Sequence, residues 1–298
     1  MVVRVAILDD YQQVALTTAD WSSIADQIQV DVFTDTLSDV DSLAKRLEPY
    51  EIICAMRERT KFLPLLLDRL PNLRLIATTG NGGNSTVEHI WTLIMSVARH
   101  IVLEHINIRT SNPQWQTVVP MGLAGSTLGL IGVGRLGSET AKIAKVFGMK
   151  VIGWSPHLTP ERAEAQGVEF IASKQELLSR SDIVSLHLVL SESTTKIINA
   201  ADLDLMKASS FLINTSRGPL IDEAALVEAL KNKKIAGAGL DVFEQEPLPL
   251  DHPLRFLDNV TLSPHNGYIN ETSYKVFWTS TVENIKGYLD GKPRSLLE

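Results

Sequence analysis

Apolar and polar residues alternate in blocks along the chain, and these blocks predict strands and helices that follow one another. The apolar runs carry no inward–outward alternation, which is typical of strands buried on both faces of a parallel sheet. In the first part of the chain, strands are predicted at 3–8, 29–33, 51–55 and 73–78, with helical periodicity at 42–47 and 62–70. Repeated strand–helix alternation predicts a doubly wound parallel α/β sheet.

A second alternating set begins near residue 127 and predicts a second parallel sheet. Its strands are expected at 128–131, 149–154, 167–171, 183–188, 210–214, 235–241 and 260–262. Its helices are expected at 135–147, 173–180 and 221–232. The fold class predicted is therefore α/β with two doubly wound parallel-sheet domains.

Two further helices set the expected domain boundaries. Residues 84–106 are apolar around most of a helical circumference, which predicts one long buried helix between the domains. A last helix, near 272–289, follows the second sheet and can return to cover the first. We expect one domain from 1–83 plus 266–298 and another from 84–265.

The long helix carries His89, His100 and His105, which we interpret as structural or packing residues. His100 and His105 lie five positions apart, and this spacing does not suit a shared metal-binding face. We expect no metal site.

The stretch STLGLIGVGRLGSETAKIAKVFGMKVIGWS, residues 126–155, combines a strand, a glycine turn, a helix and a second strand. This context makes the GxGxxG pattern a specific signal for a dinucleotide. Gly132 permits the tight turn, Gly134 lets the backbone approach a pyrophosphate, and Gly137 lets the helix pack closely on the strand. The helix N-terminus then offers N–H groups to the phosphates.

The end of the second strand lacks the acidic residue that accepts hydrogen bonds from the adenosine ribose in NAD-binding proteins. Ser155 stands there and carries no charge to repel a 2′-phosphate, while His157 and Arg162 can attract one. We therefore rank NADP(H) level with or slightly above NAD(H) as the expected cofactor. The alternative is that Ser155 only begins a loop and that both cofactors bind.

Composition narrows the class of protein. The net charge of −7 argues against nucleic acid or an anionic membrane as the main partner. Cys54 is the single cysteine and cannot form an internal disulfide, which suits a reducing compartment. The N-terminal apolar run is short and reads as a first strand instead of a signal peptide, and no run reaches membrane-spanning length. We expect a cytoplasmic protein.

Three strand ends of the second sheet carry residues suited to one reaction. Arg217, Glu246 and His265 each follow a different strand, and the carboxyl ends of parallel strands meet at one edge. A histidine can supply a proton to a carbonyl oxygen that receives a hydride at carbon, and a carboxylate beside it orients it. An arginine can bind a substrate carboxylate bidentately. Each residue alone reads as a surface charge; together, behind a dinucleotide fingerprint, they indicate catalysis.

At these residues the chain resembles the D-isomer-specific 2-hydroxyacid dehydrogenases, which include phosphoglycerate dehydrogenase and the glyoxylate/hydroxypyruvate reductases. The resemblance rests on TLGLIGVGRLG, HLVLSESTTKIIN, FLINTSRGPLIDEAALVEAL, GAGLDVFEQEPL and SPHNGY, in the family's order. It implies a flavodoxin-like substrate domain, a Rossmann-type cofactor domain and a cleft between them. It also implies that Arg217, Glu246 and His265 are catalytic.

The resemblance implies further contacts. Those to the cofactor fall on Gly132, Gly134, Arg135, Leu136, Gly137, Ser155, Leu188, Thr194, Thr215, Asp241 and Thr86. Those to the substrate carboxylate fall on Arg57, Glu58 and Gly80. From its own segment alone, Arg57 reads as a solvated arginine. Family members are usually homodimers that pair through their cofactor domains.

The chain departs from the family pattern at two places. Val189 replaces a proline usual in the HLPLT run. After the turn at Gly80, a helix and a strand of the first domain, about twenty residues by average element lengths, are absent. Either the chain lacks this segment, or the segment is missing from the sequence as given. Removing an interior strand exposes backbone groups and core, which favours the second explanation.

These observations predict an NAD(P)-dependent oxidoreductase that moves a hydride between a nicotinamide cofactor and a small 2-ketoacid or D-2-hydroxyacid. One alternative is a nucleotide-sensing binding protein, because the resemblance extends to transcriptional corepressors on this fold. Another is a formate- or phosphite-type dehydrogenase. Formate oxidation needs no proton donor paired to a carbonyl, so the pairing of Glu246 with His265 favours hydroxyacid chemistry.

Overall fold

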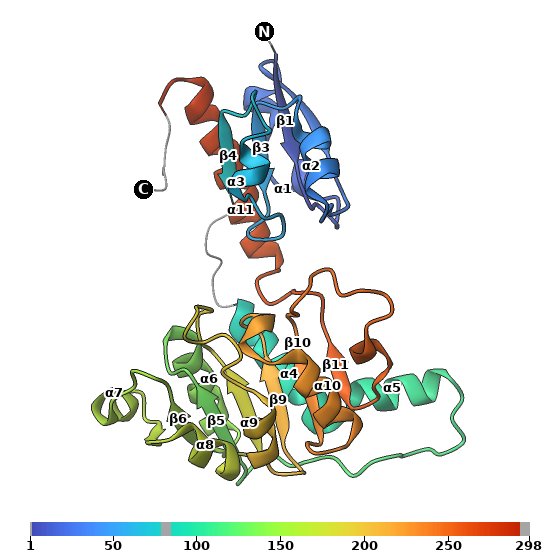
Figure 1. The fold of residues 1–298 in the computed structure, drawn as a ribbon, viewed down its shortest axis with the longest axis vertical. Coiled ribbons are helices and arrows are strands. Elements are labelled where there is room, and N and C mark those ends of the chain that lie inside the picture. Colours follow the sequence, from blue (N-terminus) through green and yellow to red (C-terminus); the bar gives the residue numbers. More distant parts are fainter. Residues whose placement is uncertain (1, 79–84, 293–298) are drawn as a thin grey trace. The chain divides into compact units, whose positions relative to one another are not determined.

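The computed structural model describes residues 2–78 and 85–292 of the 298-residue chain (Figure 1). The strands are β1 Val3–Ile7, β2 Ile28–Val32, β3 Ile52–Ala55, β4 Leu75–Thr78, β5 Thr127–Ile131, β6 Lys150–Trp154, β7 Glu169–Phe170, β8 Ile183–Leu186, β9 Phe211–Asn214, β10 Gly237–Leu240 and β11 Val260–Leu262. The α-helices are α1 Ala15–Thr18, α2 Val40–Leu47, α3 Pro64–Leu67, α4 Ser85–Arg99, α5 Ile101–Arg109, α6 Arg135–Val146, α7 Pro160–Ala165, α8 Lys174–Arg180, α9 Ala200–Leu205, α10 Glu223–Lys231 and α11 Glu271–Leu289. Short 3₁₀ turns lie at Ser22–Ile24, Gly218–Leu220 and Pro253–Phe256.

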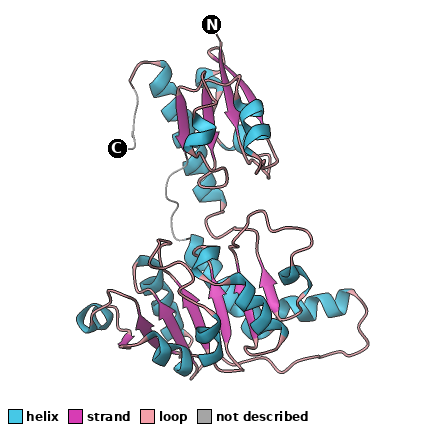
Figure 2. Cartoon of the chain, in the orientation of Figure 1, coloured by secondary structure: helices cyan, strands magenta, loops and turns pink. Residues whose placement is uncertain are grey.

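The chain divides into two compact units, Met1–Gly83 with Ile269–Glu298, and Asn84–Tyr268. The contacts therefore place the second boundary before Ile269, whereas the sequence analysis drew it before Asn266. Each unit is built on its own parallel sheet (Figure 2).

The first unit has a four-stranded sheet in the order β2-β1-β3-β4, which is the start of the flavodoxin-like order 2-1-3-4-5. Helices α2 and α3 cover one face, where Leu47 and Leu66 pack against Ile53. Helix α11 contacts α1 and β4, and its Phe277 and Trp278 are almost fully buried. The last described helix, α11, thus belongs to the first unit.

The second unit has a seven-stranded parallel sheet in the order β11-β10-β9-β8-β5-β6-β7. Read from β7, this is the dinucleotide-binding order 3-2-1-4-5-6 extended by one strand. Successive side chains point to opposite faces of a strand. Ile183 accordingly packs with α4 and α6, and Val184 packs with α8, α9 and α10. Helices on both faces confirm the predicted doubly wound α/β class.

Several helices begin at a side chain that satisfies an otherwise unpaired backbone N–H. Asn199 accepts from two such groups and forms a capping box with Asp202 at α9. The other capping side chains are those of Asp39, Thr159, Ser173, Asp222 and Asn270. These residues set where the helices start along the chain.

The predicted long helix 84–106 is wrong as a single element. His100 adopts the left-handed conformation, with φ of 50°, and this ends α4 and begins α5. The prediction of burial on several sides holds only for α4, because α5 has no buried residue. Helical periodicity alone did not reveal the break, since a left-handed residue changes the chain direction without changing the apolar pattern.

Residues 79–84, between β4 and α4, lie outside the described residues, so the expectation that a segment is missing there stays a prediction. The physical argument for that expectation assumed an interior strand. Among the described residues β4 is an edge strand, so a fifth strand beyond it would be an outer one. Losing such a strand leaves an edge unpaired and does not open the sheet.

Among the described residues, no helix has the length and hydropathy needed to cross a membrane.

Candidate active site

The glycine turn lies between β5 and α6, and two of its glycines are required by geometry. Gly132 has φ of +104°, and a Cβ there would lie 2.8 Å from the His187 carbonyl oxygen. A Cβ on Gly137 would lie 2.3 Å from the Gly132 oxygen, so only glycine lets the helix start this close to the turn. A Cβ on Gly134 would meet nothing within 4 Å. The open space over Gly134, at the N-terminus of α6, fits a phosphate group.

Arg135 and Leu136 form the first turn of α6. Arg135 is exposed, and Leu136 packs partly into the core beneath the helix. At the end of β6, half-buried Ser155 begins a loop, and the Arg162 guanidinium donates to the His157 carbonyl oxygen at 3.2 Å. A positive charge therefore lies over the loop that follows Ser155.

The remaining predicted cofactor residues lie in the same unit, mostly at the carboxyl edge of the sheet. Leu188 follows β8 and lies beside Gly132. The Thr194 hydroxyl donates to the Val189 carbonyl and is buried. Thr215 follows β9 and is buried, and Thr86 lies on the first turn of α4.

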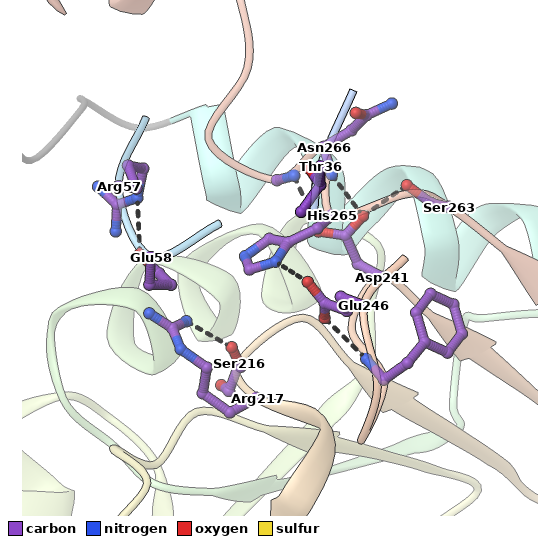
Figure 3. A network of polar contacts seen from close by, with 12 residues as sticks. Thr36, Arg57, Glu58, Ser216, Arg217, Asp241, Glu246, Ser263, His265 and Asn266 are labelled. Carbon is purple, nitrogen blue, oxygen red and sulfur yellow. Dashed lines mark hydrogen bonds and ion pairs between the residues drawn. The ribbon is translucent and has the colours of Figure 1, made fainter. Parts of the chain in front are cut away.

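The strand order brings Arg217, Glu246 and His265 together. They follow β9, β10 and β11, which are neighbours in the sheet. The His265 Nδ1 lies 2.6 Å from a Glu246 carboxylate oxygen, and the other oxygen accepts the Phe243 N–H at 2.9 Å (Figure 3). The Glu246 carboxylate is thus held at both oxygens, and the His265 Nε2 is left as the ring nitrogen that can act on a substrate.

The turn that carries Arg217 packs on the loop of Glu246 because of the glycine beside it. A Cβ on Gly218 would lie 2.0 Å from the Phe243 carbonyl carbon. Without a Cβ, the turn after β9 packs directly on the backbone that leads to Glu246. The half-buried Arg217 guanidinium donates to the Ser216 carbonyl oxygen at 2.6 Å (Figure 3).

Asp241 is fully buried at the end of β10 and contacts the loop that carries His265. One carboxylate oxygen accepts the Asn266 N–H at 2.7 Å, and the other accepts the Gly267 N–H at 2.8 Å (Figure 3). The Asp241 backbone carbonyl accepts the His265 N–H at 2.8 Å. Three successive amides of the loop are thus bound by one residue.

Sequence reasoning missed His89, which it treated as a packing residue. Its Nε2 lies 2.8 Å from the Ser263 Oγ and 3.0 Å from the Asp241 carboxylate. The sequence did contain a signal for this role. His89 lies one helical turn after Thr86, which was assigned to the cofactor.

His187 is a second histidine that pattern analysis did not single out. It follows β8 beneath the glycine turn, and burial lowers the pKa of its imidazole from 6.5 to about 4. Among the described residues, neither ring nitrogen has a hydrogen-bond partner. This imidazole is therefore neutral at neutral pH.

The predicted substrate residues lie in the first unit. Arg57 follows β3 with a positive φ of 52°, and its Nε lies 3.5 Å from a Glu58 carboxylate oxygen. Next to them, Arg59 donates to the Asp9 carbonyl and covers the Tyr11 ring at 4.5 Å. Gly80 lies outside the described residues.

Comparison with known families identifies the second unit. A family model described as "D-isomer specific 2-hydroxyacid dehydrogenase, NAD binding domain" matches residues 91–267. A glyoxylate reductase of Aeropyrum pernix is 35% identical over 286 residues, which cover 82% of this chain and 84% of that protein. A D-3-phosphoglycerate dehydrogenase of Methanocaldococcus jannaschii is 41% identical over 208 residues, which cover 70% of this chain and 40% of that protein.

Among solved structures, a putative D-3-phosphoglycerate dehydrogenase oxidoreductase from Ralstonia solanacearum has the same fold. It superposes with a TM-score of 0.91 at 32% identity and covers 99% of this chain and 96% of that one. The similarity thus extends over both units.

Proposed function

The chain belongs to the family of D-isomer-specific 2-hydroxyacid dehydrogenases, and from this membership we propose that it is an NAD(P)-dependent oxidoreductase. It transfers a hydride between the nicotinamide and the C2 atom of a small 2-ketoacid or D-2-hydroxyacid, and works mostly as a ketoacid reductase. The observation that carries the proposal is the 2.6 Å contact of His265 with Glu246, beside Arg217, in the unit that carries the glycine turn.

His265 is the proton donor in this proposal. Glu246 accepts the Nδ1–H, which leaves the Nε2 of the imidazolium to protonate the carbonyl oxygen as charge develops there. Arg217 binds the substrate carboxylate and polarises the carbonyl. When bound, the nicotinamide supplies the hydride in reduction and accepts it in oxidation. In the reverse direction, neutral His265 takes the hydroxyl proton at Nε2.

The unit Asn84–Tyr268 is proposed to hold the cofactor, and the discontinuous unit to contribute to the substrate site through Arg57, Glu58 and Gly80. The cofactor contacts are those assigned above, from Thr86 to Asp241. Uncharged Ser155 and the Arg162 guanidinium over its loop support a slight preference for NADP(H).

We propose a homodimer that forms through the cofactor units. Helix α5 buries none of its own side chains, and Ile101, Ile106 and Ile108 are at least half exposed on it. Trp115 and Val119, on the segment after it, are 76% and 96% exposed. Large exposed apolar side chains on one helix and the segment after it are typical of a protein–protein interface, and a second copy of the chain covers them in our proposal.

A cytoplasmic location fits the single cysteine. Cys54 is buried, and burial raises the pKa of its thiol to about 12, so the thiol stays protonated and unreactive.

The test is oxidation of NADPH and of NADH against glyoxylate, hydroxypyruvate, pyruvate and bulkier 2-ketoacids. The wild type is compared with His265→Ala and Glu246→Ala. We expect turnover with at least one acid and a loss of about 10²- to 10⁴-fold in kcat for either variant. The ratio of kcat/KM for the two cofactors decides the significance of Ser155.

Glu244→Ala is the matched control, because Glu244 is an exposed acid in the same loop. It should keep wild-type kcat. Tight cofactor binding without turnover on any acid would contradict the reductase proposal and support a sensing protein. Turnover of formate or phosphite that survives His265→Ala would support a formate- or phosphite-type dehydrogenase.

A further inference from the structure

The loop that carries His265 is held in an unusual conformation by one buried residue, Asp241, through its backbone carbonyl and its carboxylate. His265 has φ of 54°, in the left-handed region that non-glycine residues rarely adopt. Such a conformation is unfavourable and persists only where the surroundings determine it. Here Asp241 binds the N–H groups of His265, Asn266 and Gly267. The position of the His265 ring therefore depends on where the Asp241 carboxylate lies.

The Asp241 carboxylate is in turn held by two side chains, Ser263 and His89. The Ser263 hydroxyl donates to Asp241 Oδ1 at 2.5 Å. A hydroxyl has one proton, so the Ser263 oxygen must accept in its contact with the His89 Nε2 at 2.8 Å. The His89 Nε2 therefore carries a hydrogen. The same Nε2 also lies 3.0 Å from Asp241 Oδ1, within ion-pair distance of the carboxylate.

Helix α4 presents His89 to this loop by direct packing. A Cβ on Gly267 would lie 3.8 Å from the His89 Cδ2 and 3.7 Å from the Thr86 Cγ2. The His89 side chain is 18% exposed, and its hydrogen-bonding nitrogen points at polar atoms instead of apolar core. A residue that served only for packing would not need a donor at this position.

We propose that His89 is a positioning residue for catalysis by His265. Its Nε2–H binds the Ser263 hydroxyl, and that hydroxyl binds the Asp241 carboxylate. Asp241 holds the three loop amides, and the loop keeps the His265 Nδ1 on Glu246. The proposal rests on the proposed function for its kinetic readout. It connects the first turns of α4 to the proton donor within one unit of the molecule.

Two substitutions distinguish the role of the His89 Nε2–H donor from that of the imidazole ring. His89→Gln keeps an N–H at about the reach of Nε2, and His89→Leu removes it. We expect His89→Leu to lower kcat by about 10- to 100-fold, a part of what a positioned acid contributes. KM and the dissociation constant of the cofactor should change by less than about threefold, and His89→Gln should recover most of kcat. Thr92→Ala is the matched control, because Thr92 is exposed on α4 and its hydroxyl bonds only within the helix.

Two further measurements distinguish positioning from loss of structure. In a His265→Ala background, His89→Leu should lower the residual rate by less than about twofold, because its effect passes through His265. The downfield proton resonance of the short His265–Glu246 hydrogen bond should shift or broaden in His89→Leu and stay in place in His89→Gln and Thr92→Ala.

An unmoved resonance and unchanged kcat in His89→Leu would overturn the proposal. Equal losses in His89→Leu and His89→Gln, or a full further loss in the His265→Ala background, would do the same. If the wild type turns over no 2-ketoacid, the proposed function fails, while the resonance still decides whether His89 positions His265.

Discussion

Replacing buried His187 with leucine should remove a defined part of the pH dependence of stability. The folded protein keeps this imidazole neutral until about pH 4, whereas the unfolded chain binds the proton below about pH 6.5. Between these values the unfolded state carries more protons, so the free energy of unfolding falls as pH falls. The penalty is absent above pH 6.5, grows down to about pH 4, and is constant below that.

The two pKa values set the size of the effect. Between pH 7.5 and pH 5.0, protonation of the unfolded chain at His187 lowers the free energy of unfolding by about 2 kcal/mol. His187→Leu should lose this contribution, so the variant should be less sensitive to acid than the wild type by that amount. At pH 7.5 it should be at least as stable, because leucine leaves no ring nitrogen without a partner.

The assay is equilibrium urea unfolding at pH 7.5 and pH 5.0. Pulse hydrogen exchange of peptides that contain β5 and β8 restricts the measurement to the unit that holds His187. His157→Gln, at an exposed histidine, is the control and should follow the wild type. If His187→Leu loses as much stability as the wild type on acidification, within about 0.5 kcal/mol, then His187 is not a neutral buried imidazole and the argument is refuted.

Three other outcomes follow from the structure. Gly218→Ala places a Cβ 2.0 Å from the Phe243 carbonyl carbon, so the turn that carries Arg217 must move away from the loop that carries Glu246. We expect kcat to fall at least about tenfold, and unchanged kinetics would contradict this packing. Ser155→Asp should move the NADPH-to-NADH ratio of kcat/KM at least about tenfold toward NADH, because a carboxylate repels the 2′-phosphate of NADPH. An unchanged ratio would show that this position does not select the cofactor. Cys54, whose thiol has a pKa of about 12, should react with a disulfide reagent at pH 8 only after urea unfolding, and rapid labelling of the native protein would contradict its burial.

Several features could be predicted from the sequence because neighbouring residues determine them. Strand and helix periodicity predicted two doubly wound sheets, and the glycine turn was recognised from its flanking elements. Arg217, Glu246 and His265 could be placed together because parallel strands end at a common edge. The pairing of Glu246 with His265 needed only that rule and the family resemblance, and the structure has it at 2.6 Å.

The remaining features depend on contacts between segments distant in sequence. His89 and Ser263 are 174 positions apart, and no periodicity links them, so the partner of Asp241 became visible only in three dimensions. The break at His100 and the edge position of β4 were likewise invisible, because a backbone angle and a strand order leave no hydrophobic pattern. The sequence by itself thus determined the elements and the residue types at the strand ends. Tertiary structure alone decided which polar groups are buried against one another, because burial depends on how whole elements pack.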